Sequence, residues 1–485
     1  MNKKQAQEYI NSQKDIIIDM NDRVWEYAET AFTEYKSAEK LCSVLENAGF
    51  EVKRGVGKIE TAFTAAFGKG KPVIGLLAEY DALAGLNQMG SSAVKQPTAP
   101  GDEGKAGHGC GHNCYGAAIV GAALGVKEYL SANPQLSGTV IVYGCPGEEG
   151  GSGKTFMARE GVFDGCDAAL TWHPSSVTSV ASGSSLANYQ VLYKFYGVSS
   201  HAAADPEAGR SALDALELMN TGVQYLREHI PDAARIHYAI TNTGGFSPNV
   251  VQARADVLYL IRSPKSSQVK ELYERVNNIA RGATLMTDTR VEIDFVKACS
   301  EIVKNETLER VLYANMEQSP MPSFTQEEMD FAGEIRASYE NPKDILEHAV
   351  RRCGESYREQ LIPLYAQNKN INDFLLPYYT NEVVSAGSTD VGDVTWICPT
   401  AQFDSVTTAA GTPNHSWQFA SCNKSSIAHK GVIYAAQVLA GSAIDLFESP
   451  ETLKNATDEH KKRTGGESYK CPIPEGVVPR APDKL

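Results

Sequence analysis

The chain has 485 residues, of which 42% are hydrophobic and 21% are charged, and its net charge is −14. This length exceeds one ordinary core, so we expect two domains or one large domain with an insert. The acidic balance argues against nucleic acid and anionic membranes as partners. Because the N-terminus begins an amphipathic pattern and no apolar run approaches the ~18 residues of a membrane span, we expect a cytoplasmic protein. The ten cysteines lack paired spacing and indicate reduced thiols.

The first part of the chain combines helical patterns with short apolar runs. Apolar residues at helical spacing over residues 4–30 and 37–48 predict two helices. Four apolar runs bounded by turn residues predict strands at residues 60–67, 72–78, 138–144 and 168–172. The second of these is apolar nearly throughout, which is typical of a strand buried on both faces.

Three of these predicted strands end in polar side chains. Asp81 follows the second strand, Glu148 and Glu149 follow the third, and His173 follows the fourth. Open α/β sheets place functional groups at the carboxyl ends of their strands. Each residue has an ordinary alternative: a helix cap or salt bridge for Asp81, a solvated loop for the glutamate pair, and a structural histidine for His173. The coincidence of three such strand ends favours a functional site.

Glycines alternate with metal-capable side chains over residues 107–113. One glycine separates Cys110 from His112, and a run of small apolar residues, 115–126, follows and predicts a helix. Glycine lets the backbone turn tightly, so that a thiolate and an imidazole two residues apart can converge on one point. A buried cysteine beside a helix-capping histidine would give the same pattern, so this segment alone does not decide the matter.

A new alternation begins near residue 187. It predicts, in order, a strand at 189–196, a helix at 211–228, strands at 236–242 and 253–262, a helix at 267–283 and a strand at 289–296. This βαββαβ order is that of a ferredoxin-like unit. We therefore expect an inserted domain at 187–302 and a catalytic domain formed by 1–186 and 303–485. Within the latter, residues 318–380 are expected to be mostly helical, and an apolar helix at 428–447 is expected to close the domain.

A site for two divalent ions needs several thiolate, imidazole and carboxylate ligands. The chain offers five candidates at the segments above and nearer its C-terminus: Cys110, His112, Glu149, His173 and His415. A carboxylate that does not bind metal would take a proton from an activated water and pass it to the leaving nitrogen. In a Glu-Glu pair, one residue can bind metal while the other serves as this base.

Nucleotide hydrolysis is a rival interpretation of residues 147–155, which resemble a phosphate-binding loop. That motif has four residues between its first glycine and Gly-Lys-Thr, whereas five separate Gly147 from Gly153. Two glutamates would also face the phosphates. We therefore reject a nucleotide site here.

The order of these motifs resembles the amidohydrolase branch of the aminoacylase and glutamate-carboxypeptidase metallopeptidase superfamily. The resemblance covers nearly the whole chain. It is carried by Asp81, Cys110-Gly-His112, Glu148-Glu149, Trp172-His173-Pro174, His201 and His415, and by the longer stretches 78–86, 143–157 and 237–242.

This resemblance implies an α/β fold, with a di-metal peptidase-like catalytic domain built on a central mixed sheet flanked by helices. The insert would be a lid and dimerisation domain. Glu148 would be the general base, and Asp81 would orient a ligating imidazole. Two divalent ions, Mn²⁺ or Zn²⁺, would be bound by the five candidate ligands. In a homodimer, His201 of the insert would reach the developing oxyanion of the partner's substrate, and Asn249 and His237 would contact substrate. Arg262 is a further candidate for substrate binding because a guanidinium can grip a carboxylate with two hydrogen bonds, and an exposed structural arginine is the alternative.

The implied reaction is hydrolysis of the amide bond of an N-acyl amino acid, with p-aminobenzoyl-glutamate the expected substrate. A dipeptidase or N-acyl-amino-acid deacylase of the same mechanism, or a subunit that needs a related partner chain, remains open. Three departures from the resembling pattern bear on this. Asn113 stands where an aspartate is usual, Glu79 stands where other members have a ligating histidine, and residues 318–380 are longer than in compact relatives.

Overall fold

The computed structural model describes residues 1–342, 344–481 and 484, and it divides into two compact units. The larger unit comprises residues 1–183, 303–383 and 394–469. The smaller unit comprises residues 184–302, 384–393 and 470–485. The smaller unit thus includes the expected insert together with two short segments that the sequence analysis had assigned to the catalytic domain.

A seven-stranded mixed sheet forms the centre of the larger unit, in the order β1-β2-β4-β3-β5-β13-β6. Its strands are β1 (Glu51–Arg54), β2 (Phe63–Lys69), β3 (Val73–Ala78), β4 (Gly138–Gly144), β5 (Ala168–Ser175), β6 (Ser179–Ala181) and β13 (Thr400–Val406). β4, β3, β5 and β13 are mutually parallel, so their carboxyl ends meet at one edge of the sheet. This arrangement brings the three polar strand ends together.

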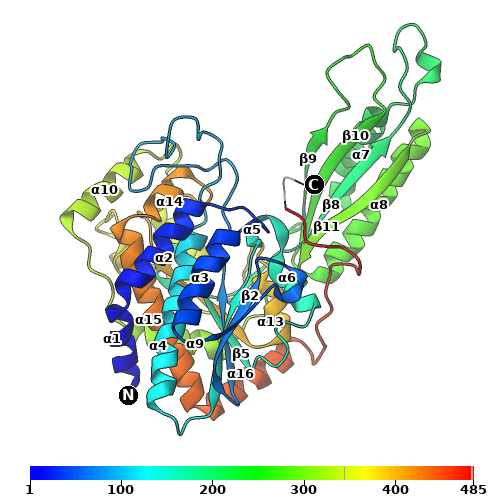
Figure 1. Cartoon of the computed structure of the whole chain (residues 1–485). Helices are drawn as coiled ribbons and strands as arrows, with labels where there is room; N and C mark the ends of the chain where they lie inside the picture. The colour runs from blue at the N-terminus through cyan, green and yellow to red at the C-terminus, as the bar shows by residue number, and fades with distance from the viewer. Residues whose placement is uncertain (343, 482–483, 485) are drawn as a thin grey trace. The chain divides into compact units, whose positions relative to one another are not determined.

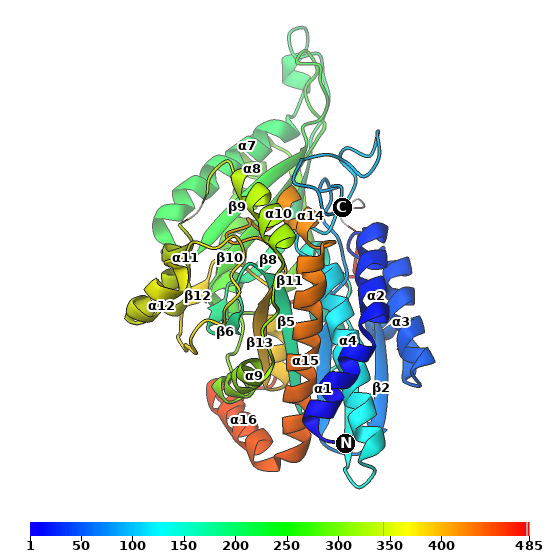
Figure 2. The same ribbon diagram turned by 90° about the vertical axis from the view of Figure 1, so that its left-hand side faces the viewer.

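Two apolar helices pack side by side in the core of the larger unit, α4 (His112–Ala132) and α15 (Ser426–Glu448) (Figures 1 and 2). α4 is rich in alanine and glycine, and it is buried almost all round as far as Val126. By length and composition α15 would be long and apolar enough to cross a membrane, contrary to the expectation of no such run. Its apolar window is 83% buried within the protein, so α15 is a core helix here.

The N-terminal helical pattern, predicted as one helix over residues 4–30, forms two helices. They are α1 (Lys3–Ser12) and α2 (Lys14–Tyr27), and the chain leaves helical geometry at Gln13, where ψ is 5°. α3 (Tyr35–Asn47) matches the next predicted helix. The remaining helices of the larger unit are α5 (Glu148–Gly151), α6 (Gly153–Arg159), α9 (Glu306–Gln318), α10 (Gln326–Ala337), α11 (Ile345–Cys353), α12 (Arg358–Tyr365), α14 (Trp417–Cys422) and α16 (Pro450–Arg463). Short 3-10 turns lie at Val56–Lys58 and Glu355–Tyr357, and α13 (Val391–Ile397) spans the boundary between the units.

The smaller unit has the βαββαβ order that the sequence predicts. Its elements are β8 (Ala187–Tyr196), α7 (Ala212–Leu226), β9 (Arg235–Asn242), β10 (Arg254–Ser263), α8 (Ser266–Thr287) and β11 (Arg290–Cys299), with 3-10 turns at Pro206–Ala208 and Arg227–His229. The antiparallel sheet has the order β11-β8-β10-β9, and α7 and α8 pack against each other and the sheet (Figure 2). A small parallel pair, β7 (Ser184–Ser185) and β12 (Val384–Ser385), completes the unit. The predicted α/β fold class with a ferredoxin-like insert is confirmed.

Candidate metal centre

The glycine-spaced segment leads directly into α4, which begins at His112. Gly111 precedes it with a φ of +80°, a left-handed conformation that favours glycine. A Cβ at this position would lie 2.7 Å from Cγ of Pro174 and 2.8 Å from Nδ2 of Asn423. Only glycine therefore fits between these neighbours, and its turn sets Cys110 and His112 beside each other.

The other predicted ligands come from strand ends and one loop. Glu149 lies in the single helical turn α5 that follows β4, whereas His173 lies within β5 because β5 pairs as far as Ser175 with β13, a strand that the sequence analysis did not predict. His415 lies in a loop before α14, with a φ of +55°. Its backbone N–H donates to the carbonyl of Gly109 at 3.0 Å, which holds the loop against the glycine-spaced segment.

Five predicted ligands form two groups of three in the larger unit. The ligand atoms of Cys110, His112 and His173 lie within 4.8 Å of one another, as do those of Cys110, Glu149 and His415. Cys110 Sγ is 3.4 Å from His173 Nε2, and His415 Nε2 is 3.2 Å from Glu149 Oε1. The thiol of Cys110 belongs to both groups, so the arrangement offers two neighbouring cation positions that share one sulfur.

Hydrogen bonds orient two of the histidine rings. Nδ1–H of His112 donates to Asp81 Oδ1 at 2.8 Å, and Nδ1–H of His173 donates to the carbonyl of Pro174 at 2.8 Å. With the Nδ1 proton held in this way, each ring in its neutral form carries its lone pair on Nε2. Nε2 of His112 is fully buried and makes no hydrogen bond within the part of the chain that the structure describes. A buried lone pair beside a thiol, a second imidazole and carboxylates fits a divalent metal ion.

Burial and neighbouring charges shift the pKa values of these groups strongly. Burial lowers the pKa of His173 to about 4 and, with the charge of Glu149, raises that of Cys110 well above its usual range. Burial alone would lower the pKa of His112, but Cys110, Asp81 and Glu79 raise it. Burial alone would raise the pKa of Glu149, but His415 and His112 lower it to about 2. Cys110 and His112 thus hold protons that a cation would displace on binding, whereas His173 and Glu149 have already lost theirs near neutral pH.

The sequence analysis missed Glu34, a buried side chain that holds the turn before Glu148 and Glu149 in place. This buried side chain accepts hydrogen bonds from the backbone N–H of Gly147 at 2.8 Å and from the hydroxyl of Thr61 at 2.9 Å. Asp81 Oδ2 accepts from the backbone N–H of Glu149 at 3.0 Å. Burial and the nearby charge of Asp81 raise the pKa of Glu34 to about 8. Two carboxyl groups therefore fix the turn that carries the glutamate pair.

Asn113 and Glu79 differ from the family pattern, and the structure shows what each of them contacts. Asn113 donates from Nδ2 to Asn21 Oδ1 and to the carbonyl of Asn423, both at 3.0 Å, so an amide suits this position better than a carboxylate. Glu79 is buried and forms an ion pair with Lys154, which is fully buried. Oε1 of Glu79 lies 2.5 Å from Nζ of Lys154. Lys154 therefore belongs to the surroundings of the metal groups and not to a phosphate loop.

The remaining predicted residues lie in the smaller unit as two pairs. His201 is exposed and forms a bridge with Val250, and the N–H of Ala202 donates to the carbonyl of Asn249 at 2.9 Å. His237 on β9 and Arg262 on β10 lie on adjacent strands. Burial, followed by the charge of Arg262, lowers the pKa of His237.

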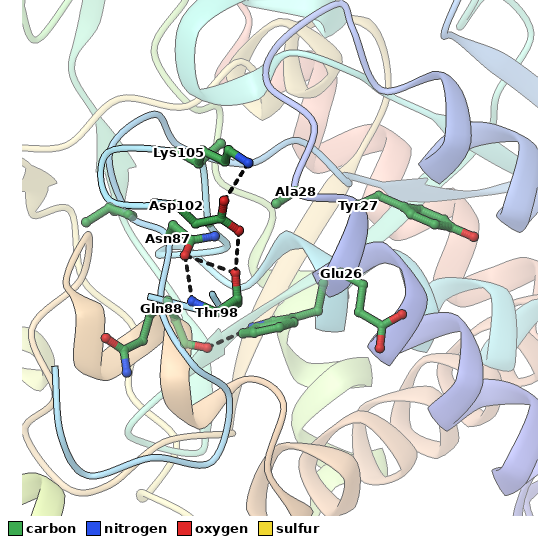
Figure 3. A pocket seen from close by; sticks show the side chains of 13 residues that line it. Glu26, Tyr27, Ala28, Asn87, Gln88, Thr98, Asp102 and Lys105 are labelled. Atoms are coloured by element: carbon green, nitrogen blue, oxygen red, sulfur yellow. Dashed lines mark hydrogen bonds and ion pairs between the residues drawn. The ribbon is translucent and has the colours of Figure 1, made fainter. Parts of the chain in front are cut away.

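A cavity of about 530 Å³ lies beside the glycine-spaced segment, lined in part by Gly107 and Trp25 (Figure 3). Its polar side chains bond to one another. Thr98 donates from its hydroxyl to Asn87 and to Asp102, both at 3.1 Å, and Asp102 pairs with Lys105. No candidate metal ligand lines this cavity within the described residues, so it is separate from the metal groups.

Comparison with known proteins assigns the family. Residues 75–359 match the model of peptidase family M20/M25/M40. The chain is 48% identical over 472 residues to one of the subunits of p-aminobenzoyl-glutamate hydrolase from Escherichia coli (strain K12), covering 97% of each chain. This chain belongs to the M20/M25/M40 family. It is therefore a metallo-amidohydrolase, an enzyme that acts on amide bonds, as the sequence analysis expected.

Two more distant likenesses agree with this membership. The chain is 31% identical over 306 residues to the Xaa-Arg dipeptidase of Mus musculus, which covers 60% of this chain and 65% of the dipeptidase. The fold is similar to that of a dinuclear metal-binding peptidase of the M20 family from Bacillus subtilis, with a TM-score of 0.56 at 17% identity, covering 90% of this chain and 99% of the other.

Proposed function

We propose that this M20/M25/M40 member hydrolyses the amide bond of p-aminobenzoyl-glutamate, releasing p-aminobenzoate and glutamate. The observation that carries the proposal is the pair of three-residue groups that share Cys110, found in a chain 48% identical to a p-aminobenzoyl-glutamate hydrolase subunit over 97% of its length. The five ligands would hold two divalent ions. When bound, such ions polarise the amide carbonyl and lower the pKa of a water molecule.

Glu148 acts as the general base. It takes a proton from the attacking water and delivers it to the leaving nitrogen of glutamate, a role that requires a carboxylate close to the ions. Glu148 meets this requirement because its carboxylate lies within 4.8 Å of a ligand atom of His112. Asp81 acts through His112. Its hydrogen bond to Nδ1 orients the ring and leaves Nε2 available to bind a metal ion.

The smaller unit supplies the groups that recognise the substrate and the transition state. The family resemblance assigns His201 to the developing oxyanion, donated from the partner subunit of a homodimer, and Asn249 and His237 to substrate contact. Arg262 grips the glutamate carboxylate, because a guanidinium offers two parallel hydrogen bonds. Its Nε makes no hydrogen bond to any described residue, which supports this assignment.

Manganese and zinc are both compatible with this mixture of ligands. Thiolate and imidazole favour zinc, and carboxylates favour manganese. We propose manganese as the working metal and a cytoplasmic enzyme. Since a relative that matches 97% of this chain is named as a subunit, a related partner chain is a second proposed requirement for full activity.

Release of p-aminobenzoate by the purified chain, loaded with Mn²⁺, tests the proposal. Glu148→Gln is the matched variant, since it preserves the shape of the side chain and removes the base. We expect the variant to keep its metal content and to lose about 10²- to 10⁴-fold in turnover. Undiminished turnover in the variant would refute the assignment of Glu148 as the general base.

A second candidate function is hydrolysis of dipeptides, favoured by the likeness to the Xaa-Arg dipeptidase. A panel of dipeptides, N-acyl amino acids and p-aminobenzoyl-glutamate separates the two by their kcat/KM values. Preference for a dipeptide would replace the proposed substrate but retain the metal groups and the base.

A further inference from the structure

Glu79 is a buried carboxylate that the proposed reaction does not use. It directly follows β3, and only 2% of its side chain is exposed. Oε1 forms an ion pair with Nζ of Lys154 at 2.5 Å, and the side chain of Lys154 is fully buried. Desolvation of two charges is costly, so stability alone does not explain a buried pair at this place.

The second oxygen of Glu79 faces a metal-capable nitrogen. Oε2 lies 3.2 Å from Nε2 of His112, yet the two make no hydrogen bond. Because Nδ1–H of His112 donates to Asp81, Nε2 is the ring nitrogen that is left to face Glu79 and to bind a metal ion. Such a contact is favourable when a positive charge lies between or beside the two atoms, whether that charge is a proton on the ring or a metal ion.

The separation matches that of two atoms bound to one metal ion. With metal bonds of about 2.1 Å and angles from octahedral to tetrahedral, neighbouring ligand atoms lie about 3.0 to 3.4 Å apart. A carboxylate oxygen of Glu79, one of the proposed base Glu148 and a ring nitrogen of His112 also lie within 4.8 Å of one another. His112 therefore belongs both to the sulfur-containing group with Cys110 and to an oxygen-rich group on the side of Glu79.

We propose that Glu79 is a further metal ligand through Oε2, and that Lys154 is a positioning residue that directs this oxygen toward His112. The inference rests on the proposed metal-dependent function and deepens it. Carboxylate oxygen suits manganese, whereas thiolate suits zinc. Glu79 thus raises the affinity of the His112 position for Mn²⁺ relative to Zn²⁺.

The affinities of the metal-free full chain for Mn²⁺ and Zn²⁺ test this directly, measured by competition with a chromophoric chelator and without substrate. Glu79→Gln is expected to weaken binding of one Mn²⁺ by at least about tenfold and to change Zn²⁺ binding far less. Glu309→Gln is the matched control, because Glu309 is also buried but belongs to none of the candidate metal groups. Unchanged Mn²⁺ affinity in Glu79→Gln would overturn the proposal.

Lys154→Met separates positioning from a merely structural role. Loss of orientation is expected to lower the ratio of Mn²⁺ to Zn²⁺ affinity, whereas a structural defect would lower both affinities together and refute the positioning role. The double variant Glu79→Gln/Lys154→Met removes both members of the buried ion pair. It is expected to reproduce the ratio of Glu79→Gln, and a ratio equal to that of the unmodified chain would contradict the proposal.

A crystal structure of the unmodified chain with Mn²⁺ decides the matter if the variants do not fold. Anomalous scattering locates the ion, and a distance of about 2.2 Å to Oε2 of Glu79 supports the proposal. A distance beyond hydrogen-bonding range overturns it. Neither measurement involves turnover, so a wrong substrate assignment would leave both outcomes readable.

Discussion

The metal groups and the cavity of Figure 3 are two polar regions of the larger unit that differ in how their atoms are paired. In the cavity, donors meet acceptors: Thr98 donates to Asn87 and Asp102, and Lys105 neutralises Asp102. In the metal groups, metal-capable atoms of several side chains converge on common points, and Nε2 of His112 makes no hydrogen bond to a described residue. Complementary pairs satisfy themselves, whereas converging lone pairs need a cation. How the polar atoms are paired therefore distinguishes a metal site from an ordinary polar cavity better than the residue composition of the two regions does.

The largest effect is expected at the sulfur that the two metal groups share. Cys110→Ala removes a ligand from both positions, so we expect the affinity for both ions to fall by more than about 100-fold and turnover to be lost. Cys42→Ala is the matched control, since Cys42 is also buried but lies in the apolar core. Metal analysis after dialysis measures the effect. Retention of both ions by Cys110→Ala would show that the groups are not the metal site.

A smaller effect is expected when the hydrogen bonds that orient the ligands are disturbed. Asp81→Asn replaces one of two acceptor oxygens with a donor, although both N–H groups facing Asp81 need acceptors. We expect metal affinity to fall about 10- to 100-fold.

Asp22→Asn provides the control for Asp81→Asn. Asp22 lies 2.8 Å from Nε2 of His429, so the same type of carboxylate–histidine contact occurs away from the metal groups. We expect its metal affinity to be unchanged. An equal loss in both variants would mean that Asp81→Asn acts through general stability.

A buried carboxyl outside both regions should affect stability alone. Burial raises the pKa of Glu309 to about 7, so the folded state holds this proton more tightly than the unfolded state. Stability is therefore fully present below about pH 4.5 and is lost as the pH rises through 7. Glu309→Gln removes this loss, and we expect its free energy of unfolding to exceed that of the unmodified chain by about 3 kcal/mol at pH 8 and by little at pH 4.

Denaturant unfolding at both pH values measures the effect of Glu309→Gln. Metal content serves as the internal control, because it should not change. A constant difference between the two proteins across this pH range would assign the effect to packing and not to titration.

The smallest effect is expected in the cavity. Asp102→Asn weakens an exposed ion pair with Lys105 and one hydrogen bond from Thr98. Exposed pairs contribute little to stability. Metal content and turnover should remain as in the unmodified chain. A marked loss of turnover would mean that the cavity takes part in substrate binding and would remove the distinction between the two regions.

The elements that carry the site could be predicted because their signals are local. Glycine-bounded apolar runs mark β3 and β4, and the spacing of Cys110 and His112 marks the turn before α4. The contact of Glu34 with Gly147 could not be predicted, because the two residues are 113 positions apart and only folding brings them together.

The limits of local signals also explain two errors. β13 escaped prediction, and with it the extension of β5 past His173, because Gln402, Asp404 and Ser405 interrupt the apolar pattern of this strand. The break at Gln13 was missed because the apolar spacing continues across it, from Ile10 to Ile17. The local sequence places Lys154 only in a phosphate-like motif, because its ion pair with Glu79 depends on the tertiary structure.

The sharing of one sulfur by two groups makes the enzyme's competence depend on the oxidation state of a single atom. Conversion of Cys110 to a sulfenic or sulfinic acid would alter a ligand at both positions in one event. Bound cations draw electron density from the sulfur, and burial limits the approach of peroxides. Bound ions and burial would thus both protect the one atom on which the two positions depend.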